Sequence, residues 1–234
     1  ALTRSLGELA VRLGVDESRV IVAPILIKEA TFDPSAYDKE DVKARYGFSG
    51  YKIVLFVGRL SYEKRVDVLI RAFSKLVKKN QRIRLLLVGS GPYERKLKEL
   101  CSELGISDKV VFFGQVPHER APELLAMADV FVLPSMREGL PKALLEAMAM
   151  KRPIVATLVL GIIDVVKPGV ETLLVRTGDI NALAEALGKV LIDERLAMRL
   201  AQRARETFER EYSYERVYHR VRHIMKKFII SSFG

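Results

Sequence analysis

Short apolar runs alternate with helix-length amphipathic segments along most of this chain, and this alternation restricts the fold more than any other feature. The runs show no strict polar alternation and are rich in branched residues and Phe, which is typical of strands covered on both faces. Helical spacing between the runs predicts helices near residues 64–79, 93–104, 119–128, 142–150 and 179–192. We therefore expect an α/β fold, a Rossmann-like, doubly wound parallel sheet of about six strands with helices on both faces. The predicted strands are Ile53–Val57, Ile83–Val88, Val110–Phe113, Val130–Leu133, Ile154–Ala156 and Thr172–Val175.

The two ends of the chain lie outside this alternation. Residues 1–23 show a helix-turn-strand pattern, and residues 24–50 have the Pro and Gly content of a linker with a short helix. At the other end, residues 193–212 and 213–230 predict two final helices, with Ser213 as the N-cap of the second. The run "PIVATLVLGII" is too short to span a bilayer and is predicted to be a buried strand with its exit loop.

Composition limits the compartment and the class of protein. The 234 residues are 49% hydrophobic, which is enough for a packed core and argues against disorder. Cys101 is the only cysteine, so no internal disulfide is possible and a reducing, cytoplasmic location is expected. Helical spacing places its thiol on an apolar helix face, as a core residue. The chain begins with Ala1, within a helix-like pattern and without a visible secretory signal, so we expect a piece of a longer protein.

Positive charge is concentrated near the C-terminus. The formal net charge is +10, and residues 195–227 hold ten Lys or Arg against four Glu. A basic helical end suits the surface of an anionic membrane, nucleic acid or an acidic neighbouring domain. An ordinary solvated helix face explains the same residues equally well. Few aromatic residues are interleaved for base stacking, so nucleic acid is the weaker interpretation.

The stretch "SMREGLPKALLEAMA" places Glu138 before a predicted helix and Glu146 in its second turn. Pro141 suits the first helical turn, and the N–H groups that follow it would face outward with the positive end of the helix dipole. A phosphate would be stabilised there, and a carboxylate one turn deeper could accept hydrogen bonds from ribose hydroxyls. The alternative is that Glu138 only complements the dipole and Glu146 is solvated.

Two further strands end in loops with possible ligand groups. In "GRLSYEK" the first strand ends at Gly58, and Arg59 and Lys64 precede the next helix as two cations that could neutralise a diphosphate. They could equally be ordinary surface cations. "VGSGP", around Gly89, resembles the start of a dinucleotide fingerprint but has Glu94 at the third glycine position, which favours a tight turn over a pyrophosphate cradle. The three histidines form no metal-ligand pattern, so no metal is expected.

Together these pieces resemble the C-terminal, donor-binding domain of the retaining glycosyltransferases of family 4, which have the GT-B fold. The matching segments occur in the family's order over roughly residues 50–230, and more loosely over residues 1–34. They are "GRLSYEK", "LLLVGSGPYERKLKEL", "VVFFGQVPHERAPELLAMADVFVLPS", "EGLPKALLEAMA", "PIVAT" and "GDINALAEAL".

The resemblance implies a domain division and a donor site. Residues 1–34 would be the end of the acceptor domain and the interdomain linker, 35–212 the nucleotide-sugar-binding domain, and 213–234 the C-terminal helix and tail. The donor would be a UDP- or GDP-sugar, bound without a metal or other cofactor, and the acceptor a glycan or lipid. Glu138, Arg59 and Lys64 would act in catalysis. The implied donor-binding set is Gly58, Arg59, Lys64, Gly89, Gln115, Val116, Glu138, Gly139, Leu140, Pro141, Lys142, Ala143 and Glu146.

Within that set the resemblance assigns separate tasks. Glu138 would contact hydroxyls of the donor sugar and Glu146 the ribose. Backbone N–H groups of 140–143 would join Arg59 and Lys64 on the diphosphate, where negative charge grows in the transition state. Loops around Gly89 and at 115–116 would hold the base.

This chain departs from the family's pattern at two places. The linker reads Pro24-Ile-Leu-Ile-Lys28 where the family usually has Pro-Asn-Gly-Val-Asp, and the segment after the fifth strand reads Val159-Leu-Gly-Ile-Ile-Asp164 in place of Val-Gly-Gly-Ile-Pro-Glu. Leu160 thus replaces a glycine expected close to the donor. The acceptor domain is also missing, so weak donor binding and little transfer are expected of this chain alone.

Two other functions remain open at this point. A nucleotide-sugar 2-epimerase-like enzyme would share the fold, but would be about twice this length. A non-enzymatic Rossmann-like module could bind RNA or membrane through the basic end, with an affinity that falls steeply with salt.

Overall fold

Six parallel strands form a single sheet in the order β3-β2-β1-β4-β5-β6 in the computed structural model, which describes residues 1–232 and side chains as far as residue 226. The order reverses beside β1, which pairs with β2 on one side and β4 on the other. Each predicted strand is confirmed to within two residues at either end. The strands are β1 Lys52–Val57, β2 Ile83–Val88, β3 Val110–Gly114, β4 Val130–Leu133, β5 Ile154–Thr157 and β6 Leu173–Val175.

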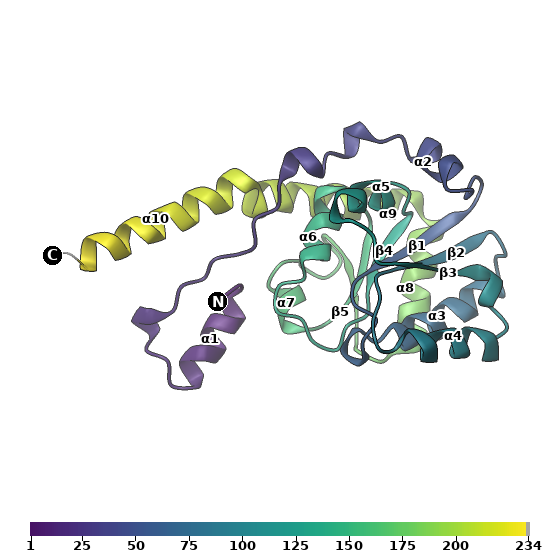
Figure 1. Ribbon diagram of the computed structural model, residues 1–234, viewed down its shortest axis with the longest axis horizontal. Coiled ribbons are helices and arrows are strands. Elements are labelled where there is room, and N and C mark those ends of the chain that lie inside the picture. The colour runs from purple at the N-terminus through teal and green to yellow at the C-terminus, as the bar shows by residue number, and fades with distance from the viewer. Residues whose placement is uncertain (233–234) are drawn as a thin grey trace.

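Helices cover both faces of the sheet, which confirms the doubly wound α/β fold. In Figure 1, α3 (Val66–Val77), α4 (Glu94–Glu103) and α8 (Ile180–Ile192) lie below the sheet. Above it lie α5 (Ala121–Ala126) and α6 (Lys142–Ala149), and α9 (Glu194–Thr207) packs against both α6 and α8. The strands read as apolar runs because both faces are covered, so that Ile53–Phe56 of β1 and all of β4 are buried.

Helix α3 begins later than its sequence spacing predicts. A single 3-10 turn occupies Tyr62–Lys64, and Arg65 takes a left-handed φ of 48° before α3 begins at Val66. Lys64 therefore lies in the turn ahead of the helix. The turn keeps Lys64 near the carboxyl end of β1.

The predicted strand near residue 20 is wrong. Helix α1 (Arg4–Arg12) forms as expected, but residues 20–28 stay extended without joining the sheet. Their backbone bonds to the chain's own start instead, because Ala23 N–H donates to Ala1 O and the Ala1 amine donates to Ile21 O. The expected linker with a short helix is present, as α2 (Lys39–Arg45). The exit from β5 also differs from a plain loop, since it folds into the one-turn helix α7, Leu160–Ile163.

The C-terminal segment changes helix type before its break. Helix α9 continues as a π-helix over Phe208–Tyr212, and α10 then runs over Tyr214–Ser232. The Arg216 N–H donates to Ser213 Oγ at 3.4 Å, which confirms Ser213 as the cap at the break. In Figure 1, α10 extends away from the sheet. Within the described residues, no helix combines the length and apolar character needed to cross a bilayer.

Cys101 is a core residue, as its helical spacing predicts. It lies in α4 with 1% of its surface exposed, and burial raises the pKa of its thiol to about 11. The first segment also contributes to the core, because Ile27 and Phe32 are each 1% exposed. The domain division at 34/35 and 212/213 stays a prediction.

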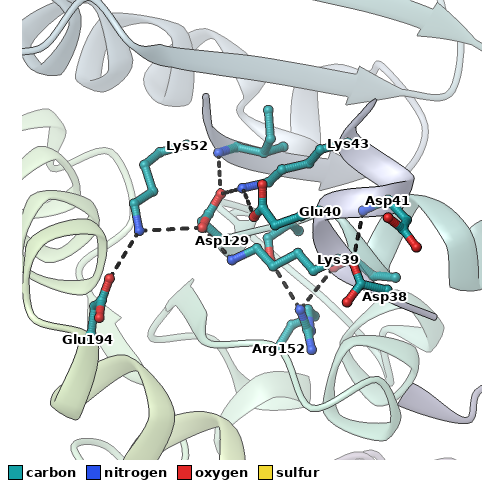
Figure 2. Close-up of polar contacts among 12 residues, drawn as sticks. Asp38, Lys39, Glu40, Asp41, Lys43, Lys52, Asp129, Arg152 and Glu194 are labelled. Atoms are coloured by element: carbon teal, nitrogen blue, oxygen red, sulfur yellow. Dashed lines mark hydrogen bonds and ion pairs between the residues drawn. The ribbon is translucent and has the colours of Figure 1, made fainter. Parts of the chain in front are cut away.

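Asp129, one residue before β4, ties the amino ends of the two central strands together. Its Oδ2 accepts the Ile53 N–H of β1 at 2.7 Å and lies 2.9 Å from Lys43 Nζ, while Oδ1 lies 2.5 Å from Lys39 Nζ (Figure 2). Burial raises the pKa of this carboxyl, but the two lysines of α2 and the Ile53 N–H outweigh that effect. The pKa of Asp129 therefore lies below its usual range.

We predict that Asp129→Asn destabilises the protein by about 3 kcal/mol at pH 7, because it leaves buried Lys43 without its main partner. A depressed pKa stabilises the fold at pH values above the unfolded-state pKa, and this stabilisation is lost as pH falls through the folded-state value. The difference between wild type and variant should thus shrink below about pH 4. Urea unfolding at pH 7 and at about pH 3 measures it.

The exposed Asp108, which pairs with Lys109 at 2.8 Å, supplies the control. Asp108→Asn should change stability by no more than about 0.5 kcal/mol at either pH. A constant penalty for Asp129→Asn at both pH values would contradict the ionic role of Asp129.

Candidate functional site

A cleft lies at the carboxyl ends of the strands, beside the point where the strand order reverses. Its volume is about 660 Å³, and its walls come from the loops after β1, β2 and β3 together with Glu146 of α6. A crevice at such a switch point is where doubly wound sheets bind ligands. Six of the predicted donor-binding residues line it: Gly58, Arg59, Gly89, Gln115, Val116 and Glu146.

Lys64 and Glu138 form an ion pair that joins the loop after β1 to the loop after β4. Lys64 Nζ lies 2.6 Å from Glu138 Oε1, and the Ser135 hydroxyl donates to the same oxygen at 2.6 Å. The Glu138 side chain is only 8% exposed and that of Lys64 22%. Neither residue is among those that line the cleft with Arg59 and Glu146. The two residues of the pair meet because β1 and β4 are neighbours in the sheet, so the loops that follow these strands are neighbours too.

Glu146 is buried, which excludes the interpretation that it is a solvated carboxylate on the polar face of its helix. Only 4% of its side chain is exposed, and its Oε1 lies 2.7 Å from His118 Nε2 and 3.5 Å from Lys142 Nζ. His118 Nε2 is also 2.9 Å from Lys142 Nζ. A single ring nitrogen cannot donate to a carboxylate and accept from an ammonium at once, so only one of these two contacts is a hydrogen bond at a time. The carboxylate is therefore held by partners that can rearrange.

Helix α6 begins at Lys142, as the sequence predicts, but Pro141 precedes its first turn. Pro141 is the N-cap, whereas the sequence places it within the first turn. Among the described residues, no side chain caps this helix start. Leu140 and Pro141 are buried, and Lys142 is exposed beside His118. The first N–H groups of α6 thus lack the side-chain oxygen that caps α8 and α9.

Close packing of two loops accounts for both glycines of "VGSGP". Gly89 has a φ of 125°, and a Cβ there would lie 2.0 Å from the carbonyl oxygen of Gly58. A Cβ on Gly91 would lie 2.3 Å from the carbonyl oxygen of Leu60. The loops after β1 and β2 therefore touch backbone to backbone. This contact agrees with the tight-turn interpretation and needs no ligand to explain it.

Gly161, in α7, supports the loop that carries Glu138. A Cβ at Gly161 would lie 2.1 Å from the Gly139 carbonyl oxygen and 2.5 Å from that of Glu138. Leu160, which replaces a glycine of the family pattern, begins α7 and is 51% exposed. The close contact with the 138–139 backbone thus falls at Gly161, and the expected effect of Leu160 on the donor stays a prediction.

His118, Ser135 and Phe32 are site residues that the sequence analysis did not assign. The Phe32 ring packs against the His118 ring at 5.5 Å between centroids, and His118 lies between the cleft and a second cavity of about 350 Å³. That cavity is lined by Leu26–Lys28, Thr31 and Phe32 of the linker, with Glu119 and Lys142. No motif connects residue 32 with residue 118, so only the fold reveals this contact.

The fold is a Rossmann-like α/β domain with a cleft beside the switch point, where sheets of this kind bind ligands. The sequence model of the glycosyl transferases group 1 family matches residues 38–207. The chain belongs to this family of glycosyltransferases.

Individual relatives agree with this assignment. Over 142 residues the chain is 37% identical to an uncharacterized glycosyltransferase of Methanocaldococcus jannaschii, covering 61% of this chain and 36% of that protein. Over 173 residues it is 35% identical to the GDP-mannose-dependent α-(1-6)-phosphatidylinositol monomannoside mannosyltransferase of Mycolicibacterium smegmatis, covering 71% of this chain and 45% of that one. The chain thus spans about half the length, or less, of these relatives.

A solved structure shows the same fold. The crystal structure of Anabaena HepE in complex with UDP-glucose superposes with a TM-score of 0.89 at 20% identity. The match covers 97% of this chain and 63% of that one. At this identity the comparison establishes the architecture of the domain.

We predict that Gly91→Ala destabilises the protein by roughly 2–4 kcal/mol, because the added methyl group collides with backbone rather than with a movable side chain. The matched control is Gly188→Ala in α8, where the new Cβ would lie 3.4 Å from the flexible end of Leu76. That change should be close to neutral, since alanine is the better helix former. Equal losses for both variants in urea unfolding would contradict the loop contact.

A double-mutant cycle tests the Lys64–Glu138 pair. We expect a coupling energy of about 1–3 kcal/mol between Lys64→Ala and Glu138→Ala, because the pair is largely buried and shares Ser135. The exposed pair Arg95–Glu99, with 3.5 Å between Nε and Oε1, should give no more than about 0.5 kcal/mol. Similar coupling energies for the two pairs would show that burial adds nothing at residue 64.

Proposed function

We propose that this chain is the donor-binding domain of a retaining glycosyltransferase of family 4, which takes a UDP- or GDP-sugar. The observation that carries the proposal is the arrangement at the switch point. Arg59 and the buried carboxylate of Glu146 line one cleft, and the Lys64–Glu138 pair joins the loops beside it. Cations, an uncapped helix start and a buried carboxylate are the groups that a nucleoside diphosphate requires.

We assign to these residues the roles that the resemblance to family 4 implies. Glu146 accepts hydrogen bonds from the ribose, and His118 gives up its contact with Glu146 when the ribose arrives. The loops around Gly89 and at 115–116 hold the base. Arg59, Lys64 and the first N–H groups of α6 bind the diphosphate, and Glu138 contacts hydroxyls of the sugar.

These groups promote the reaction by acting on the leaving group. The bond between the sugar's anomeric carbon and the diphosphate oxygen breaks, and its electron pair stays on that oxygen. The acceptor hydroxyl bonds to the same carbon, and its proton passes to the departing diphosphate oxygen. Because charge on the diphosphate is greatest in the transition state, cations aimed at it lower the barrier more than they strengthen ground-state binding. No metal is assigned a role in this proposal.

Names of similar proteins support the ligand class. The Mycolicibacterium relative is named as GDP-mannose-dependent, and the Anabaena structure holds UDP-glucose. The acceptor is a glycan or a lipid, and transfer requires the acceptor domain that completes a GT-B enzyme. Residues 195–227 are the surface we assign to an anionic membrane, and the location we propose is cytoplasmic, at the inner face of that membrane.

We predict that UDP or GDP raises the melting temperature of the chain. A nucleotide at one hundred times its Kd adds about 2.7 kcal/mol of stability, which corresponds to several degrees for a domain of this size. Lys64→Ala and Glu146→Ala should abolish the shift, because they remove a diphosphate and a ribose contact. Differential scanning fluorimetry measures the shift, and the nucleotide with the larger effect identifies the base.

Arg95→Ala, an exposed change on α4, should keep the full shift and serves as the control. Absence of a shift with both nucleotides would overturn the proposal. Turnover of a nucleotide sugar without any acceptor would instead favour the epimerase-like alternative.

A further inference from the structure

A third cavity, distinct from the two described above, lies at the opposite edge of the sheet, at the amino ends of the strands. Its volume is about 530 Å³. Lys52 opens β1, Asp129 precedes β4 and Pro153 precedes β5, whereas the cleft described above lies where the strands end. This cavity, which we name the basic cavity, is lined by Lys39, Lys52, Ala128, Asp129, Lys151, Arg152, Pro153, Val190, Leu191, Glu194, Ala197, Met198, Ala201 and Gln202.

Positive charge exceeds negative charge in the basic cavity. Four of its lining residues are cations and two are carboxylates. Asp129 Oδ1 lies 2.5 Å from Lys39 Nζ and 3.7 Å from Lys52 Nζ (Figure 2). On its other side, Lys52 Nζ lies 3.6 Å from Glu194 Oε1. The two distances of Lys52 exceed those of a hydrogen bond, so its ammonium has no close acceptor among the described residues.

Arg152 adds a half-buried charge that has no carboxylate in direct contact among the described residues. Its guanidinium donates to the carbonyl oxygens of Met150, Ala126 and Ala128, at the ends of α6 and α5. Burial lowers the pKa of Arg152, and Asp129 only partly opposes that effect. Burial likewise lowers the pKa of Lys39 despite its contact with Asp129. An added anion would compensate both cations.

Lys151 occupies a backbone position that favours glycine. It follows α6 with a left-handed φ of 53°, where helices commonly end in glycine. Its side chain is exposed at the cavity, and no ion pair holds it within the described part of the chain. A lysine that costs backbone strain and forms no such pair is better explained by a ligand than by stability.

Part of the lining of the basic cavity is apolar. Val190 and Leu191 come from the end of α8, and Met198, which is 63% exposed, from α9. A ligand that meets both parts of the lining needs an anionic group and a carbon surface. Lysine ammonium groups suit phosphate oxygens as movable point charges.

We infer that the basic cavity binds a small phosphomonoester, such as a sugar phosphate, at a site separate from the donor cleft. The phosphate lies among Lys39, Lys52 and Lys151, and the C–H face of the sugar packs on Leu191 and Met198. The inference does not depend on the proposed transferase activity, since it uses none of the cleft residues.

Isothermal titration with glucose 6-phosphate at constant ionic strength tests the site. We expect saturable binding that persists when UDP is present, weaker binding of inorganic phosphate, and no binding of glucose. Lys151→Gly should weaken glucose 6-phosphate binding about tenfold, the effect of losing one charged hydrogen bond. Because glycine fits a φ of 53°, this variant should melt no lower than wild type.

Two other variants complete the test. Lys39→Gln should weaken binding to a similar extent, and Lys78→Gln, which removes an exposed charge at the end of α3, should leave it unchanged. The inference is overturned if glucose 6-phosphate does not bind at millimolar concentration, if Lys151→Gly binds as tightly as wild type, or if UDP displaces the ligand. Equal weakening by Lys78→Gln would show general charge attraction and would overturn it as well.

Discussion

The pairing of β1 with β2 on one side and β4 on the other is the constraint on which the rest of the structure depends. Reversal of the strand order at β1 sends the helices that follow β1 and β4 to opposite faces of the sheet, and leaves a crevice between them. Lys64 and Glu138 meet because they follow these two adjacent strands. At the other edge the same adjacency lets Asp129 accept the backbone N–H of Ile53. One pairing thus organises both edges of the sheet.

The buried carboxylates at the two edges of the sheet differ in the partners that hold them. Glu146 is held by His118 and Lys142, whose side chains are about half exposed and can move. Asp129 is instead fixed by a backbone N–H and by Lys43, whose side chain is 4% exposed. A carboxylate with movable partners can exchange them for a ligand at little cost, whereas one fixed by buried groups cannot. This difference agrees with a binding role for the first edge and a structural role for Asp129.

The fold can be predicted from the sequence because the strands are covered on both faces. Each buried strand is therefore a continuous apolar run, such as Val130–Leu133. The prediction of a strand near residue 20 is wrong because local apolarity does not reveal whether a sheet edge is free to pair. The backbone of Ile21 and Ala23 bonds to Ala1 instead. The motifs predict that Arg59 and Glu146 belong to one site, and both residues line the cleft. The same motifs give no sign that Glu146 is buried. Its partner His118 comes from a separate loop, and no periodicity connects the two.

The environment of Cys101 has a practical consequence. With its thiol buried in α4 and its pKa raised to about 11, almost none of it is thiolate at neutral pH. Maleimide and iodoacetamide reagents, which attack through the thiolate, should therefore ignore the native cysteine in the folded protein. Two cysteines introduced on the surface would carry a pair of fluorophores or spin labels, so that a distance between the two edges of the sheet could be followed without first removing the natural thiol.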